Sequence, residues 1–181
     1  MEYRQAVDYL LSLADFERSG RFQDRPDVRP MLSLLRRLND PHLGPLTIHV
    51  AGSKGKGSVA AMLDSVLRAA GLHSGLYTSP HLHSYCERVR IGGEPIAEEC
   101  FARLTERLRG AADSEARSGK ARQLVTFDLL TALAFLAFQE RGVQVQVLET
   151  GLGGRVDSTN VFQKKEVCII SPISLEHTAI L

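Results

Sequence analysis

The sequence has few of the features that mark secreted, zinc-binding or membrane-spanning chains. Its three cysteines, Cys86, Cys100 and Cys168, are widely spaced and form no CxxC pair, so reduced thiols are expected rather than a zinc site. Acidic residues interrupt the N-terminus, where a signal peptide would have a basic start and an apolar core. The longest apolar run, 129–138, is broken by Thr131 and is far shorter than the roughly 20 residues of a membrane span. We therefore expect a cytoplasmic protein that does not enter a membrane.

The chain also lacks an excess of either charge. Its 181 residues include 22 Lys and Arg and 21 Asp and Glu, which leaves a net charge of +1. This balance argues against a surface built to bind nucleic acid. Apolar residues make up 44% of the sequence, enough to build the core of one ordinary domain. We expect a monomer whose partners are small molecules.

The segment 46–78 predicts a βαβ unit. A short strand at 46–51 runs directly into the glycine-rich segment 52–58, and a second strand is expected at 74–78. Between them, apolar residues at helical spacing predict an amphipathic helix. This stripe consists of Val59, Met62, Leu63, Val66, Leu67 and Ala70. Because βαβ units form parallel sheets, the fold class is predicted to be α/β with a mostly parallel sheet flanked by helices.

The other elements extend this pattern on both sides. Helices are expected around 7–14, 31–38, 97–108 and 126–140, with Thr126 as a candidate N-cap, and strands at 143–149 and 166–173. Residues 111–123 are small and polar, which predicts an exposed loop.

The segment Gly52–Ser58 predicts a phosphate-binding loop. Glycines let backbone amides approach a ligand, and the following helix N-terminus adds free N–H groups and a positive dipole end. Lys56 adds a charge for phosphate oxygens, and Ser58 a hydroxyl. The match to G-x-x-x-x-G-K-[ST] is imperfect, because the first glycine of that pattern falls on Val50 and Gly57 separates Lys56 from Ser58. A plain glycine-rich turn and a dinucleotide-binding loop are the alternatives.

Polar groups follow the ends of all four predicted parallel strands, where ligands bind in open α/β sheets. They are Lys56 and Ser58, Ser79, Glu149, and Glu176 with His177. Glu149 and Ser79 offer the oxygen ligands that Mg²⁺ prefers. His177 is a less usual magnesium ligand, and a hydrogen-bonded histidine or a titrating base is its alternative role. Glu149 has a simpler alternative too, as a solvated carboxylate at a strand end.

A second glycine-rich segment, GLGGRVDSTN at 151–160, follows the third strand. Three closely spaced glycines indicate that the backbone passes near another group. Arg155 and Asp157 present opposite charges there, and an arginine fork suits a carboxylate or phosphate. A solvated turn with an ordinary ion pair is the alternative.

Six motifs, in order, resemble the folylpolyglutamate synthase/dihydrofolate synthase family of the Mur ligase superfamily. They are HVAGSKGKGS, GLYTSPHL, ERVRIGGEPI, TFDLLTALAF, VLETGLGGRVDSTNV and ISLEHTAIL. The resemblance runs from the glycine loop to the last residue and, more loosely, through the N-terminal helix. It implies a P-loop-containing Mur-ligase-type ATPase domain that acts in folate biosynthesis and one-carbon metabolism.

The resemblance implies an ATP- and Mg²⁺-dependent amide-forming ligase. ATP would phosphorylate the carboxylate of dihydropteroate or a folate, and the amine of L-glutamate would attack the acyl phosphate. By the resemblance, the nucleotide-binding residues are Gly52, Ser53, Lys54, Gly55, Lys56, Gly57 and Ser58. The implied catalytic residues are Lys56, Glu149 and His177, and the implied metal ligands are Ser79, Glu149 and His177. The implied substrate-binding residues are Thr126, Phe127, Arg155, Asp157 and Asn160.

Three positions depart from the family pattern: Lys54 stands in place of Asn, Phe127-Asp128 in place of Phe-Phe-Glu, and Glu176 in place of Asp. The family also has a C-terminal glutamate-ligase domain, which is expected to lie outside residues 1–181. We therefore expect an incomplete ATP-binding domain that is inactive by itself. The alternatives are a non-catalytic ATP-binding module, a cell-wall Mur ligase and a nicotinamide-dependent oxidoreductase.

Overall fold

A six-stranded mixed sheet organises this computed structural model, which describes residues 1–14, 27–117 and 124–176. The strand order is β4-β3-β2-β5-β1-β6. The strands are β1 Leu46–Ala51, β2 Ser74–Tyr77, β3 Val89–Ile91, β4 Glu94–Pro95, β5 Val145–Glu149 and β6 Val167–Ile170. β1 pairs in parallel with β5 and β6, and β5 pairs in parallel with β2, whereas β3 is antiparallel to both β2 and β4. The predicted α/β fold class with a mostly parallel sheet is confirmed.

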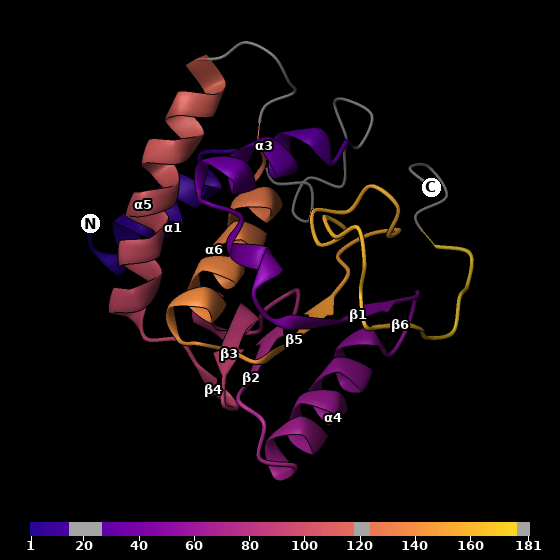
Figure 1. Cartoon of the computed structure of the whole chain (residues 1–181). Coiled ribbons are helices and arrows are strands. Elements are labelled where there is room, and N and C mark those ends of the chain that lie inside the picture. The colour runs from indigo at the N-terminus through magenta and orange to yellow at the C-terminus, as the bar shows by residue number, and fades with distance from the viewer. Residues whose placement is uncertain (15–26, 118–123, 177–181) are drawn as a thin grey trace.

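Helices cover the two faces of the sheet unequally. They are α1 Tyr3–Leu11, α3 Arg29–Arg37, α4 Lys56–Ala69, α5 Glu98–Arg117 and α6 Thr126–Glu140, with short 3₁₀ turns at Pro41–Leu43 and Tyr85–Arg88. Figure 1 shows α4 on one side of the sheet and α6 on the other, with α1, α3 and α5 packed around α6. No helix among the described residues is long and apolar enough to cross a bilayer.

The β3–β4 hairpin was not among the predicted strands. Gly92 and Gly93 connect the two strands with φ angles of 61° and 93°. Both glycines therefore adopt the positive φ that two-residue hairpin turns require. The adjacent glycines were the available signal, but the flanking strands are too short to show an apolar alternation.

Helix α6 lies at the centre of the larger core. Twelve of its residues are buried, because it is enclosed by the sheet on one side and by the outer helices on the other. The prediction that Thr126 caps this helix is wrong. The N-cap is Val125, whose N–H donates to the Asp128 carboxylate at 3.0 Å. The Thr126 hydroxyl instead donates to the Leu10 carbonyl at 2.8 Å and so ties α6 to α1.

Helix α5 is longer than its apolar stripe indicated. The predicted exposed loop over 111–123 is wrong for 111–117, which continue the helix, whereas 118–123 lie outside the described residues. Alanine, glutamate and arginine favour helix in this stretch. Ala112 is also buried in the larger core, so packing supports the extra turns.

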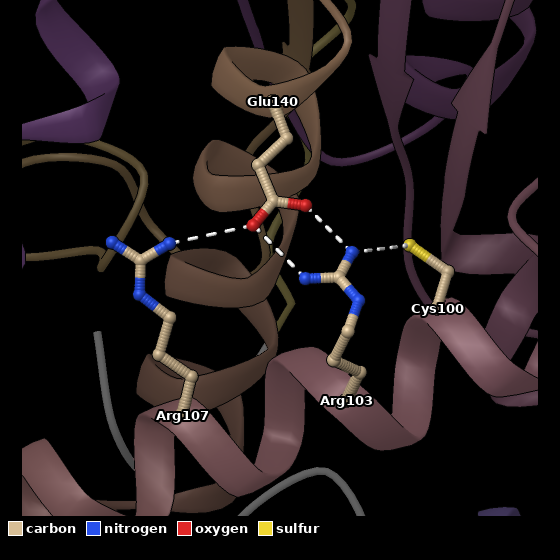
Figure 2. Close-up of polar contacts among 4 residues, drawn as sticks. All are labelled: Cys100, Arg103, Arg107 and Glu140. Carbon is tan, nitrogen blue, oxygen red and sulfur yellow. Dashed lines mark hydrogen bonds and ion pairs between the residues drawn. The ribbon is translucent and has the colours of Figure 1, made fainter.

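Ion pairs join α5 to the last turn of α6. Figure 2 shows the Glu140 carboxylate between Arg103 and Arg107 of α5. Arg103 donates from both terminal nitrogens, at 3.1 and 2.6 Å, and one of these nitrogens also lies 3.7 Å from the Cys100 sulfur. These groups hold the pKa of Glu140 below its usual value, the Arg103 hydrogen bonds being the largest cause. A two-pronged arginine–carboxylate pair fixes the register of the two helices.

The buried side of α4 differs from its predicted stripe. Met62 and Val66 are exposed, whereas Ala60 and Asp64 are buried against the sheet. Asp64 is tolerated inside because its carboxylate accepts hydrogen bonds from the Ser74 hydroxyl at 2.6 Å and from Arg68 at 3.0 Å. Residues 59, 63 and 67 of the stripe are partly buried, as the spacing predicted.

Candidate functional site

The segment between β1 and α4 has the geometry of an anion-binding loop. Gly52 and Gly55 adopt φ angles of 133° and 78°, conformations that residues with a side chain rarely adopt. Gly55 is the N-cap of α4 and supplies no side-chain hydrogen bond to the first turn. The first N–H groups of α4 therefore lack a side-chain cap at an end that favours negative charge. Lys56 is half-buried at this end, and Ser58 is exposed.

Gly52 is required by close contact as well as by its backbone conformation. A Cβ atom at this position would lie 2.1 Å from the Ser171 hydroxyl oxygen and 2.8 Å from the Ser171 carbonyl oxygen. Ser171 follows β6, and its N–H donates to the Ala51 carbonyl at 2.8 Å. The loop is thus pressed against the chain that leaves the neighbouring parallel strand.

The carboxyl ends of three parallel strands meet at Glu149. This residue ends β5 and is 5% exposed. One of its carboxylate oxygens accepts a hydrogen bond from the Ser79 N–H, just past β2, at 3.1 Å. On the other side, a Cβ atom at Gly57 would lie 3.3 Å from the same oxygen. Of the predicted convergence, the structure therefore shows Ser79 and the backbone of the glycine loop beside Glu149, whereas a shared site with Lys56 and Ser58 stays a prediction.

The residues at this end of the sheet suit a hard cation. Among the residues that the structure describes, no three His, Cys, Asp or Glu side chains gather as a metal cluster. Mg²⁺ does not need such a cluster, because it keeps several waters and takes one or two carboxylates together with phosphate oxygens. Ser79 and Glu149 offer oxygen ligands of that kind. His177, the third predicted ligand, lies outside the described residues.

The start of α6 meets the second glycine-rich segment. The Phe127 ring lies against Gly151, where a Cβ atom would be 2.6 Å from the ring edge. The same ring packs on Tyr77 with a centroid separation of 6.0 Å. Beside it, the Ser158 hydroxyl donates to the Asp128 carboxylate at 2.6 Å, and both residues are buried. The structure thus brings Phe127 together with segment 151–160, although the two are far apart in sequence.

Asp157 shapes this segment from inside. Its carboxylate is buried and accepts hydrogen bonds from the Leu152 N–H and the Thr159 N–H, both at 2.9 Å. Burial raises the pKa of the Asp157 carboxyl, and the hydrogen bonds from Thr159 and Leu152 oppose that shift. Arg155 is exposed, and its carbonyl accepts from the Asn160 side chain at 3.0 Å. Contact of Arg155, Asp157 and Asn160 with a substrate stays a prediction, as it does for the buried Thr126.

A buried polar network beneath the site was missed in the sequence. His49 in β1 contacts the Thr159 hydroxyl at 2.7 Å and the Thr150 hydroxyl at 3.0 Å through one ring nitrogen. Burial, helped by the charge of Lys165, lowers the pKa of His49 to about 4. The network links β1, which leads into the glycine loop, to the segment that follows β5. A histidine within an apolar strand gave no signal of this, because its partners lie about 100 residues away.

Comparison with known proteins gives a consistent result. No protein-family model matches the chain. A probable bifunctional folylpolyglutamate synthase/dihydropteroate synthase of Haloferax volcanii is 40% identical over 181 residues, which cover 100% of this chain and 20% of that protein. A solved complex of folylpolyglutamate synthase with AMPPCP and folate has a TM-score of 0.90 and 35% identity, covering 100% of this chain and 42% of the other. By sequence and by fold, the chain matches the N-terminal part of folylpolyglutamate synthases.

A second solved folylpolyglutamate synthase, from Mycobacterium tuberculosis and complexed with ADP and AMPPCP, has a TM-score of 0.80 and 34% identity. It is covered over 37% of its length by 94% of this chain. The present residues thus span about a fifth to two fifths of these folylpolyglutamate synthases. The resemblance indicated by the six motifs and the Mur-ligase-type fold are both confirmed.

Proposed function

We propose that residues 1–181 form the ATP-binding part of a ligase that joins L-glutamate to dihydropteroate or a folate. The observation that carries the proposal is the loop at Gly52–Gly55, which leads into the uncapped start of α4, where Lys56 is followed by Gly57 beside the Glu149 carboxylate. The two solved relatives described above are complexes with AMPPCP or with ADP and AMPPCP, and one of them also contains folate. AMPPCP is an ATP analogue, so these complexes support a nucleoside triphosphate as the ligand of the loop.

Each residue of the loop has a physical role in this proposal. The amides at the start of α4 would hold the phosphate oxygens, and Lys56 would neutralise the charge that grows as the terminal phosphoryl group moves. Ser79 and Glu149 would hold a magnesium ion, which supplies charge neutralisation between the phosphates when bound. His177 is proposed as a third ligand by the resemblance. The phosphoryl group would pass to a substrate carboxylate, and the glutamate amine would displace phosphate from that acyl phosphate.

The pterin-bearing substrate is proposed to lie between the start of α6 and segment 151–160. Phe127 offers an aromatic face there, and Arg155 is an exposed cation. Asp157 would act by holding the shape of its loop, since both of its oxygens already accept hydrogen bonds from residues of that loop. Glutamate ligation is proposed to need sequence beyond residues 1–181, so the chain alone is expected to bind nucleotide without making product.

Calorimetric titration of the 181-residue chain with ATP, with and without Mg²⁺, tests the nucleotide site. We expect binding by the parent and at least a tenfold loss in Lys56→Ala, because a hydrogen bond to a charged group contributes about 1.5–3 kcal/mol. Lys164→Ala is the matched control, since it removes the same charge from an exposed residue on the segment that enters β6. Equal binding by Lys56→Ala and Lys164→Ala would contradict the proposed site. Tighter binding of NAD than of Mg-ATP would favour an oxidoreductase instead.

A further inference from the structure

The segment that leaves β6, residues 171–176, is bound to the phosphate loop at several points, and we call it the strap. The Ser53 N–H donates to the Pro172 carbonyl at 3.0 Å, and the Lys54 N–H points to the same oxygen at 3.4 Å. The Ser53 hydroxyl donates to the Ser174 carbonyl at 3.1 Å and accepts from the Ser174 N–H at 3.0 Å. Ser53 therefore holds the strap through its backbone N–H and through its hydroxyl, which both donates and accepts a hydrogen bond.

An ion pair joins the other end of the strap to the loop. The Lys54 ammonium lies 3.5 Å from the Glu176 carboxylate. The two side chains are 74% and 37% exposed, so water and salt screen the pair strongly. Exposed pairs of this kind hold their partners weakly and exchange them readily.

We propose that Lys54 exchanges Glu176 for the nucleotide phosphates, so that Glu176 competes with the ligand and sets its affinity. This inference rests on the proposed function. Lys54 directly precedes Gly55, the N-cap whose helix offers its uncapped amides to an anion. A triphosphate carries several negative charges against the single charge of Glu176, and the helix N-terminus concentrates them near Lys54. The Lys54 ammonium therefore pairs with the phosphates when nucleotide is bound and with the Glu176 carboxylate when it is absent.

The exchange is confined to one end of the strap. The hydrogen bonds of Ser53 with Pro172 and Ser174 are between neutral groups, and they do not depend on where the Lys54 charge points. They keep the loop in place while the ion pair opens. Binding of nucleotide thus releases the Glu176 end of the strap, next to the predicted ligand His177, and leaves the rest of the loop unchanged.

A double-mutant cycle on Lys54→Gln and Glu176→Gln tests the exchange, with ATP affinity measured by calorimetry at low and high salt. At low salt we expect Glu176→Gln to tighten ATP binding about two- to fivefold, the range that a surface ion pair allows. We expect no such gain in the Lys54→Gln background, and a smaller gain at high salt. Glu99→Gln, an exposed position on α5 across the sheet, removes the same charge and should leave the affinity unchanged.

The outcomes separate this inference from the proposed function. An unchanged affinity in Glu176→Gln, or an equal gain with and without Lys54, overturns the exchange while the loss of binding in Lys56→Ala still supports the nucleotide site. Absence of ATP binding by the folded parent overturns both. The exchange is supported if Glu176→Gln gains ATP affinity only when Lys54 is present. This gain should also shrink at high salt and should not occur in Glu99→Gln. Without nucleotide, Glu176→Gln should lose no more than about 1 kcal/mol of unfolding free energy, the worth of the ion pair, and a larger loss would point to a structural effect instead.

Discussion

Replacing Gly52 by alanine should disrupt the phosphate loop through the backbone rather than through lost contacts. The new Cβ would lie 2.1 Å from the Ser171 hydroxyl oxygen, which can rotate away, and 2.8 Å from the Ser171 carbonyl oxygen, which cannot. Moving that carbonyl strains the bond from the Ser171 N–H to the Ala51 carbonyl. A φ of +133° adds about 1–3 kcal/mol of strain, and the overlap adds about 1–3 kcal/mol more. We expect Gly52→Ala to lose about 2–6 kcal/mol of unfolding free energy and most of its ATP affinity.

Two other glycines provide matched controls for this experiment. Gly55→Ala has a φ of +78° and open space around its Cβ, so it should cost only the left-handed strain of about 1–2 kcal/mol. Gly44→Ala has a φ of −74° and the same open space, so it should stay within about 0.5 kcal/mol of the parent. Urea unfolding of the three variants gives this order directly. If Gly52→Ala is as stable as Gly44→Ala, the contact with Ser171 does not constrain the loop.

Three further predictions concern stability. Folding lowers the pKa of His49 from 6.5 to about 4. Between these pH values the unfolded chain binds a proton at His49 and the folded chain does not, so acid favours unfolding. The free energy of unfolding should therefore drop by about 2 kcal/mol from pH 7 to pH 5. Urea unfolding should show this loss in the parent but not in His49→Gln. An equal change of unfolding free energy with pH in the two proteins would refute the prediction. Glu140→Gln should lose about 0.5–1.5 kcal/mol by weakening its pair with Arg103, and the loss should shrink in high salt; a salt-independent loss would contradict the ion pair. Asp128→Ala should lose about 2–4 kcal/mol in urea, because the N–H of Val125 and a buried serine hydroxyl lose their acceptor; a loss below about 1 kcal/mol would contradict this.

Segments whose local pattern agrees with their surroundings were predicted well. The strand at 46–51 and the helix at 126–140 have the predicted bounds, because a short apolar strand before a glycine loop and a long apolar helix are strong local signals. The glycine loop between β1 and α4 was placed correctly for the same reason, whereas its binding of phosphate stays a prediction. The contact between Ser79 and Glu149 followed from the rule that parallel strands end at one edge, and Gly57 of the glycine loop lies beside the same carboxylate.

The predictions failed where a distant partner decides the outcome. Asp64 is buried on a face where the pattern favoured Met62, because Ser74 and Arg68 complete its hydrogen bonds. Residues 111–117 stay helical because Ala112 reaches the larger core, which their polar neighbours do not reveal. Thr126 was predicted to cap α6 because it stands at the start of the apolar helix, but its hydroxyl donates to the Leu10 carbonyl of α1 instead.

The sequence by itself determined the resemblance to folylpolyglutamate synthases, the α/β class and the glycine loop between β1 and α4, since each depends on residues that are close together along the chain. Only the tertiary structure decided what holds that loop. The strap at Ser171–Glu176 lies nearly 120 residues after Gly52–Lys54, and the pair of Lys54 with Glu176 exists because β1 and β6 are neighbours in the sheet. Short-range patterns record the backbone preferences of single segments. Hydrogen bonds and ion pairs between segments depend on which strands lie side by side, and that is settled only when the whole sheet forms.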